Sequence, residues 1–160
     1  MDSQAIEMLL PGTPPTVREM YSDHGRKEQI QRQYGSITIS DITWAKVSLR
    51  ASEIVECSIY HWFSNWTNNV ARRPESFGKA GWRCIDVRPN IVDYWSKFHT
   101  WLEPPVLLDA SVLGRPHGLH LMEGHTRIGI LRGLIFYGVL QPDLKHYIWR
   151  GTPKTVGPVS

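Results

Sequence analysis

The chain has 160 residues, of which 41% are hydrophobic and 21% are charged, a composition typical of one globular domain. This composition disfavours disorder and a coiled coil for the chain as a whole, and a net charge of +3 is too small to indicate nucleic-acid binding by itself. Because no apolar run is long enough to cross a bilayer and residues 1–15 lack a secretory signal, we expect a cytoplasmic protein without a membrane partner.

The two ends of the chain predict irregular structure around a single domain. Residues 1–15 close in the sequence Pro-Gly-Thr-Pro-Pro, which predicts a loose N-terminal arm. Residues 151–160 are rich in Pro and Gly and predict a flexible tail. The domain is therefore expected over residues 16–150, and its second half, residues 85–150, carries the most informative motif.

The first elements predicted within the domain are strands and a long helix. Residues 37–49 carry apolar side chains at strand-like spacing and predict one or two strands. Over residues 51–70 the apolar side chains recur at helical spacing, with Ser52 as the N-cap, so one continuous helix is predicted. Trp62 and Trp66 share its apolar face, four residues apart, and are predicted to lie in the core.

A loop, a short strand and a second helix are predicted next. Residues 72–81 have the composition of a loop, and residues 82–87 predict a short strand. Asn90 is the expected N-cap of a helix that ends before Pro104 and Pro105. One face of this helix carries the apolar residues Ile91, Tyr94, Trp95, Phe98 and Trp101 or Leu102, and Trp95 and Trp101 are assigned to the core.

Short strands and a third helix complete the predicted domain. Residues 106–108 are a buried-strand run, and turn residues at 114–118 lead into a strand over residues 119–122. A helix is predicted over residues 124–134 and a last strand over residues 146–149. This alternation predicts an α/β or α+β fold, in which a small mixed sheet is flanked by helices.

The junction between the strand and the third helix carries the residues of greatest chemical interest. Gly124 permits a backbone conformation that a side chain would block, and the amides that follow are unpaired donors at the positive end of a helix. Thr126 can cap the helix or donate its hydroxyl to a phosphate, and Arg127 can stabilise the phosphate charge. The sequence therefore predicts a phosphate-binding site formed by Gly124, His125, Thr126 and Arg127.

Two residues of this junction are candidates for catalysis. Glu123 ends the strand, where its carboxylate could hold a metal ion or accept a proton. His125 could act as an acid or base, or contact the phosphate. The alternative is a capped amphipathic helix without a ligand, in which Thr126 is the cap, Arg127 is solvated and Glu123 is an exposed strand end.

Residues 104–108 and 121–131, with Glu-Gly-His-Thr-Arg at 123–127, resemble the ParB/sulfiredoxin superfamily. The resemblance implies a small α/β domain with a mixed sheet, in which this motif lies at the phosphates of a nucleotide. Activities known in the superfamily are CTP binding and hydrolysis in chromosome partition proteins, ATP-dependent reduction of sulfinic acid, phosphorylation of free serine, and nuclease activity. It implies a nucleotide or other phosphate ligand here and, for an enzyme, a hydrolase or transferase that uses Mg²⁺ with a nucleoside triphosphate.

The chain departs from two branches of that superfamily. Partition proteins have Glu-Arg-Arg after the glycine, whereas here His125, Thr126 and Arg127 follow it, so that only Gly124 and Arg127 carry over. Sulfiredoxins have a cysteine where His125 stands, so their reductase chemistry is not expected. No helix-turn-helix segment, which a partition protein would need to bind its DNA site, follows the motif.

Two further classes of function remain open from the sequence. An interaction module, such as an inhibitor, antitoxin or scaffold, would retain the fold without the chemistry, and the long helix over residues 51–70 could then form a homodimer. Nucleic-acid binding would use residues 110–160, which carry six basic and two acidic side chains.

Histidines near the junction suggest a metal site as an alternative. His117, His120 and His125 lie close together in the sequence, with Glu123 among them, and imidazoles with a carboxylate bind zinc or manganese. Strand alternation directs His117 and His120 to opposite faces unless the turn bends them, so turn histidines without a metal are the simpler interpretation.

Overall fold

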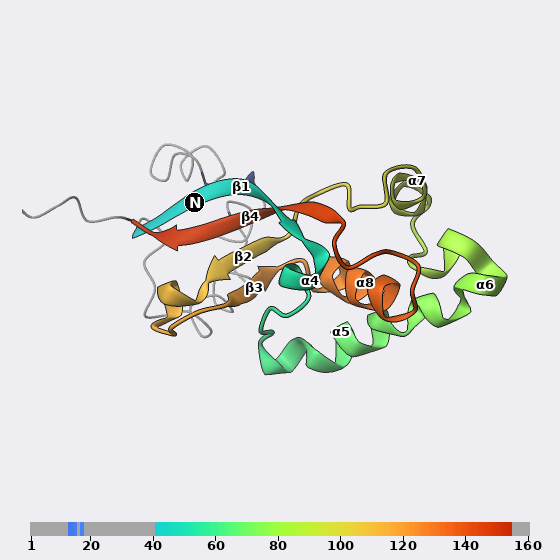
Figure 1. Ribbon diagram of the computed structural model, residues 1–160, viewed down its shortest axis with the longest axis horizontal. Coiled ribbons are helices and arrows are strands. Elements are labelled where there is room, and N and C mark those ends of the chain that lie inside the picture. The colour runs from blue at the N-terminus through green and yellow to red at the C-terminus, as the bar shows by residue number, and fades with distance from the viewer. Residues whose placement is uncertain (1–12, 16, 18–40, 155–160) are drawn as a thin grey trace, which may run out of the picture.

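The computed structural model describes residues 13–15, 17 and 41–154 of the chain. Most of the predicted N-terminal arm, and residues 155–160 of the predicted tail, lie outside the described residues. The described residues form a sheet of long and short strands, and several helices gather at one end of this sheet (Figure 1).

Four strands form one mixed sheet in the order β1-β4-β2-β3 (Figure 1). These strands are β1 (Ile42–Arg50), β2 (Val106–Asp109), β3 (Leu119–Glu123) and β4 (Lys145–Pro153). β4 runs antiparallel to β1 and parallel to β2, while β2 and β3 form an antiparallel pair. The predicted α/β class with a small mixed sheet is therefore confirmed.

β4 continues beyond the strand that the sequence predicts. Gly151, assigned to the flexible tail, pairs with Trp44 of β1, and Pro153 pairs with Ile42. A side chain at position 151 would place its Cβ 2.8 Å from the Trp44 ring, so glycine is what allows this ring to lie against the strand. The predicted start of the tail is therefore wrong by three residues, because 151–153 belong to the sheet.

Apolar side chains on both faces of the sheet are buried, because successive residues of a strand point to opposite sides. Leu107, Leu121 and Ile148 belong to a core cluster that includes the helix α8 (His125–Phe136). On the other face, a second cluster consists of Val17, Ile42, Val106, Leu108 and Met122. The sheet thus has a core on each side, as is usual in α/β proteins.

The predicted continuous helix over residues 51–70 is wrong. The structure has α4 (Ala51–Ile54), a 3₁₀ helix (His61–Phe63) and α5 (Ser64–Ala71) in its place. The chain leaves the helix because Ser58 pairs with the edge of β3: its N–H donates to the Leu119 carbonyl, and the Leu121 N–H donates to the Ser58 carbonyl, both at 2.9 Å. This pairing satisfies backbone groups that a helix would otherwise satisfy.

Trp62 and Trp66, which the sequence assigns to the core, are instead 56% and 49% exposed. Most of α5 consists of Ser, Asn and Thr, and only Thr67 and Val70 of this helix are buried. A helix with so narrow an apolar stripe buries one edge and leaves its bulky side chains outside.

α5 and α8 pack in close contact through two glycines of α8. A Cβ at Gly129 would lie 2.9 Å from the Thr67 carbonyl oxygen, and a Cβ at Gly133 would clash with the Ala71 carbonyl oxygen of α5 and lie 2.8 Å from Pro74. Real Cβ atoms do not come this close to other atoms, so glycine at both positions is a requirement of the packing. The four-residue spacing places both glycines on one face of α8, where it meets α5.

Residues 73–84, predicted as a loop and the start of a short strand, are helical instead, and residues 85–87 form no strand. The elements are a 3₁₀ helix (Arg73–Ser76), α6 (Phe77–Ala80) and a second 3₁₀ helix (Gly81–Cys84). The Trp82 ring lies edge-on to Phe77, with ring centroids 5.1 Å apart, and parallel to Trp95 at 6.5 Å. These contacts hold the segment among helices, so it finds no strand to pair with.

The second predicted helix is present as α7 (Pro89–Phe98). It begins at Pro89, one residue before the expected cap Asn90, because proline suits the first position of a helix. Trp95 is fully buried and Trp101 is 3% exposed, so their assignment to the core is confirmed. Phe98, at the end of the predicted stripe, is 60% exposed.

Candidate functional site

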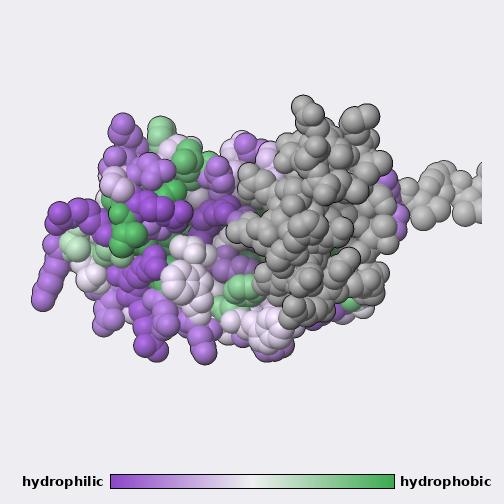
Figure 2. Space-filling view, turned by 180° about the vertical axis from the view of Figure 1, so that it is seen from behind, coloured by the Kyte–Doolittle hydropathy of each residue, from purple (hydrophilic) through white to green (hydrophobic). Residues whose placement is uncertain are grey.

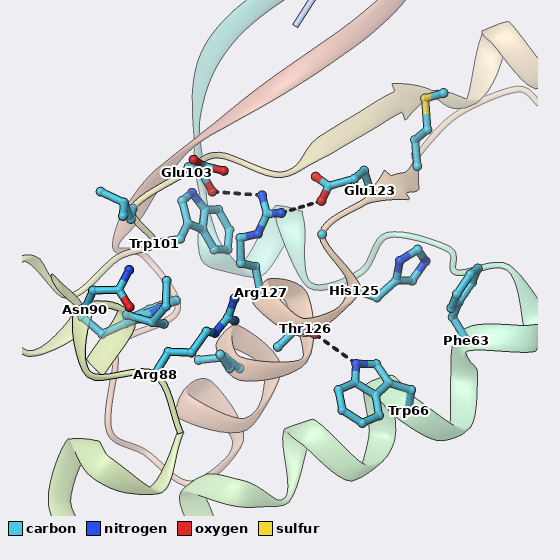
Figure 3. A pocket seen from close by; sticks show the side chains of 16 residues that line it. Phe63, Trp66, Arg88, Asn90, Trp101, Glu103, Glu123, His125, Thr126 and Arg127 are labelled. Carbon is cyan, nitrogen blue, oxygen red and sulfur yellow. Dashed lines mark hydrogen bonds and ion pairs between the residues drawn. The ribbon is translucent and has the colours of Figure 1, made fainter. Parts of the chain in front are cut away.

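A cavity of about 600 Å³ lies at the N-terminus of α8. All five residues that the sequence proposes for the site line it: Glu123, Gly124, His125, Thr126 and Arg127 (Figure 3). α5 borders the cavity on one side and the start of α7 on the other (Figure 3). The strand–glycine–helix junction is therefore open to a ligand of small-molecule size.

The backbone of the junction has the form that the sequence predicts. β3 ends at Glu123, α8 begins at His125, and Gly124 between them has a φ of 107°. A Cβ at this position would lie 2.6 Å from the Pro105 Cβ, so glycine is needed both for the φ angle and for space. The junction thus depends on glycine for its shape.

The N-terminus of α8 has no side-chain cap among the described residues. The amides of His125, Thr126 and Arg127 belong to the first turn, where no helical carbonyl can accept their hydrogen bonds. Thr126 is not the predicted cap, because it lies inside α8 and Gly124 occupies the N-cap position. The Thr126 hydroxyl instead accepts a hydrogen bond of 3.0 Å from the Trp66 indole. The positive end of the helix dipole therefore lies uncapped at the cavity.

Arg127 is paired rather than solvated. Its guanidinium forms an ion pair with Glu123 at 2.5 Å and donates to the Glu103 carbonyl oxygen at 3.1 Å. The Arg127 and Glu123 side chains are 22% and 18% exposed. These contacts use two of the five N–H donors of Arg127, which leaves donors for a ligand in the cavity.

Glu123 is engaged by the same ion pair. Its Oε1 accepts from Arg127, and its Oε2 is buried with no hydrogen-bond partner among the described residues. A buried carboxylate oxygen without a partner is costly, so this carboxylate depends on Arg127. For Glu123 to act as a metal ligand or a base, Arg127 would therefore have to release its carboxylate.

His125 is held by an aromatic neighbour from outside the motif. Its ring stacks on Phe63, with centroids 4.2 Å apart and planes 29° from parallel. Burial, together with the charges of His120 and Arg127, lowers the pKa of His125 to about 4. The imidazole is therefore neutral at pH 7. In this form it can donate or accept a hydrogen bond, but it lacks the extra proton that a general acid would donate.

A second arginine that the sequence argument missed also lines the cavity. Arg88 precedes α7, and its guanidinium binds the Asp86 carboxylate through two hydrogen bonds of 3.0 and 2.9 Å. This contact holds the pKa of Asp86 below its usual range. The Arg88 side chain is 59% exposed and so keeps surface for an anion. The packing of α7 places Arg88 at the cavity, and no sequence motif around Arg88 predicts this position.

Trp66 is the other lining residue that the sequence placed elsewhere. It was assigned to the core on helical spacing, yet it reaches the cavity from α5 and bonds to Thr126 (Figure 3). The polar composition of Ser64–Ala71 was the available signal, since five of its eight residues are Ser, Asn or Thr. A helix of that composition has little apolar surface with which to bury a tryptophan.

The alternative metal site is not assembled by the described residues. Within residues 13–15, 17 and 41–154, no group of three or more His, Cys, Asp or Glu side chains is placed to hold a metal ion. The His120 Nδ1 lies 2.8 Å from the Ser58 hydroxyl, on the edge of β3. His125 faces Phe63 instead, so the two histidines have different partners.

Comparisons of this chain with protein-family models, with curated proteins and with solved structures gave no match. The fold and the cavity define an α/β domain with a candidate ligand site at a strand–glycine–helix junction. Within the described part of the chain, no helix has both the length and the apolar character needed to span a bilayer.

Proposed function

We propose that the protein is a ParB-like domain that binds a nucleotide or another phosphate ester, with a phosphate group at the N-terminus of α8. The observation that carries the proposal is the convergence of Glu123 to Arg127 on one cavity, at a helix end without a side-chain cap. Backbone amides and the helix dipole favour an anion at such a position.

Arginines on two sides of the cavity support this choice of ligand. Arg127 comes from the first turn of α8 and Arg88 from the start of α7, so a phosphate between them would meet a guanidinium on each side. Both are already held by carboxylates of the chain, which fixes their orientation. Arginine held in this way loses less side-chain freedom when it binds a phosphate.

The ion pair between Glu123 and Arg127 links the binding of a phosphate to the binding of Mg²⁺. A phosphate that attracts Arg127 weakens its hold on Glu123, and the freed carboxylate could then bind a Mg²⁺ ion carried by the nucleotide. In a hydrolase or transferase, the same carboxylate could accept a proton from the attacking group, and Arg127 would stabilise the phosphoryl charge. The neutral His125 would contact the phosphate as a hydrogen-bond partner.

The binding test is a titration with ATP, CTP and GTP, with and without Mg²⁺, followed by calorimetry and by thermal melting. We expect at least one nucleotide to raise the melting temperature, since a ligand at 100 times its Kd adds about 2.7 kcal/mol of stability. Arg127→Ala should weaken that nucleotide about 10- to 100-fold. The matched control is Arg83→Ala, which removes an exposed arginine outside the cavity and should leave binding unchanged.

A second variant tests how the charge of Glu123 affects the affinity for a nucleotide. Glu123→Gln removes the charge that holds Arg127 and repels a phosphate, so Mg²⁺-free nucleotide should bind severalfold more tightly. The same change should abolish any gain in affinity that Mg²⁺ gives the parent. If no nucleotide shifts the melting temperature of the parent, or if Arg83→Ala weakens binding as much as Arg127→Ala, the phosphate site is rejected.

The competing proposal is an interaction module that retains the fold. It draws support from the pairing of Arg127 and from the exposure of Trp62 and Phe136, which are 56% and 81% exposed. The long helix expected to form a homodimer is absent from the described residues. The described surface visible in Figure 2 is largely hydrophilic, with apolar side chains in small groups. Size-exclusion chromatography with light scattering tests for a dimer.

Nucleic-acid binding through residues 110–160 gains little support from the placement of the arginines. Arg127 is paired with Glu123, and Arg150 lies 3.5 Å from Asp109. Arg132 donates to the Val55 and Cys57 carbonyl oxygens at 2.9 and 2.8 Å. Three cations of this segment are therefore engaged within the fold, where they cannot form an open positive face.

A further inference from the structure

We infer that Trp66 is the platform on which an aromatic base of the ligand stacks, so that the ligand is a nucleotide rather than a sugar phosphate or a polyphosphate. This inference rests on the phosphate site proposed above. It concerns a residue outside the strand–glycine–helix motif, on a different helix.

The indole of Trp66 is fixed in place at the edge of the phosphate site. Its Nε1 donates to the Thr126 hydroxyl at 3.0 Å, and Thr126 directly precedes Arg127 (Figure 3). The Arg73 guanidinium lies over the ring, 5.5 Å from its centroid. A ring held by a hydrogen bond and by a cation loses little freedom when a ligand stacks on it.

The exposed ring of Trp66 lies on the wall of the cavity. Trp66 is 49% exposed, whereas the buried residues of α5 are Thr67 and Val70. A tryptophan that is ordered yet half-exposed, and that lines a cavity, is typical of a binding surface. The hydrogen bond to Thr126 adds a reason for tryptophan here, because phenylalanine has no N–H to donate.

The other tryptophans of the cavity cannot serve the same purpose. Trp95 is fully buried, and Trp101 is 3% exposed with its Nε1 donating to the Tyr147 carbonyl oxygen at 2.7 Å. Both rings belong to the core, so an aromatic base of a ligand could stack on them only by displacing the core side chains around them. Among the tryptophans that line the cavity, Trp66 is therefore the one with an accessible ring.

The dimensions of the site fit a nucleotide. The cavity of about 600 Å³ lies in the range of pockets that enclose small organic ligands. The phosphate site at the α8 amides and the Trp66 ring are adjacent but distinct, which matches a ligand whose base is joined to its phosphate through a sugar. Base-on-aromatic stacking tolerates every base, so Trp66 sets the class of ligand more than the identity of the base.

The experiment compares three probes by calorimetry: a set of nucleoside triphosphates (ATP, CTP, GTP and UTP), ribose 5-phosphate and inorganic tripolyphosphate. Trp66→Ala should weaken the best nucleotide about 10-fold and leave tripolyphosphate within about twofold of the parent. Trp66→Phe retains a ring and should recover most of the nucleotide affinity, which also covers the case that the alanine variant fails to fold. Arg127→Ala should weaken both ligands.

Trp62→Ala is the matched control, because Trp62 is a similarly exposed tryptophan that does not line the cavity. This substitution should leave the affinities for all three kinds of probe unchanged. The inference is overturned if Trp66→Ala weakens nucleotide and tripolyphosphate equally, or if ribose 5-phosphate binds as tightly as the nucleotides, and in either case the phosphate site itself would stand. If neither nucleotides nor tripolyphosphate bind the parent, the phosphate site fails and the inference falls with it.

Discussion

The two walls of the cavity are built differently, although they face the same space. The wall formed by β3 and α8 is continuous with the core: Met122, Ile128 and Ile130 are buried beside the site residues. The wall formed by the 3₁₀ helix His61–Phe63 and α5 leaves Trp66 49% exposed, and the neighbouring Trp62, outside the cavity, is 56% exposed. The first wall therefore forms the proposed phosphate site as part of folding, while side chains of the second can change at little cost in stability.

Because the two walls differ in this way, the free energy of unfolding and the affinity for a ligand should depend on different residues. Substitutions in the core wall, or in the packing beneath it, should reduce the free energy of unfolding. Substitution of Trp66, which lines the cavity, should alter ligand affinity, and substitution of either exposed tryptophan should leave the free energy of unfolding nearly unchanged. Four changes, taken from the largest expected effect to the smallest, can confirm or break this contrast.

Acid should have the largest effect, because histidines are buried in and behind the core wall. Burial lowers the pKa of His120, His125 and His146 to about 4 each, with the nearby Arg115 adding to the effect at His120. Above about pH 6.5 neither the folded nor the unfolded state protonates them; between about pH 6.5 and 4 the unfolded chain alone takes up protons. Stability should fall through this window, by on the order of 1–3 kcal/mol per histidine.

Urea unfolding measured at half-unit steps from pH 8 to pH 4 checks this prediction. His146→Gln, in the core beside Trp101, should flatten part of the decline. A stability that stays constant down to pH 5 would mean that these histidines remain free to ionise in the folded state.

Trp95→Ala should have the next largest effect. The Trp95 ring is fully buried, lies near Trp82 and Trp101, and borders the cavity from beneath. Removing a buried tryptophan typically costs about 3–5 kcal/mol, through lost burial and the void that remains. Urea unfolding at pH 7.5 measures the change, and a loss below about 1 kcal/mol would show that the core does not extend beneath α7.

Gly133→Ala tests the contact between the two walls. In a solvated helix this change stabilises by up to about 1 kcal/mol, because alanine is the better helix former. Here the new Cβ would clash with the Ala71 carbonyl oxygen at the end of α5 and lie 2.8 Å from Pro74, so we expect a net loss of about 1–3 kcal/mol. The control is Gly78→Ala in α6, where a Cβ meets no atom within 4 Å. If Gly133→Ala stabilises the protein as Gly78→Ala does, α5 and α8 do not pack in backbone contact.

The same division explains which parts of the molecule could be predicted from the sequence. The strand pair, the turn at Gly124 and α8 follow from local signals: an apolar run, a glycine and a stripe at helical spacing. The candidate site was found because its residues are contiguous, so one local motif brings them together. Local chemistry and the final structure agree there.

The exposed wall could not be predicted in the same way, because distant contacts determine it. Ser58 breaks the predicted helix by pairing with Leu119 of β3, which lies 61 residues further along the chain. Arg88 likewise reaches the cavity through the packing of α7. Helical spacing identified an apolar face around Trp66 but could not show whether another element would cover it.

Trp62→Ala should have the smallest effect, although it removes one of the largest side chains. The Trp62 ring is 56% exposed and makes edge contacts with Tyr60 and His61 from its own segment. Few contacts with the core are lost, so the free energy of unfolding should change by less than about 0.5 kcal/mol. Urea unfolding beside Trp95→Ala makes the comparison direct, since both variants replace tryptophan by alanine. A loss above about 2 kcal/mol would place Trp62 in a packed interior or in a dimer contact, and a dependence of that loss on protein concentration would select the dimer.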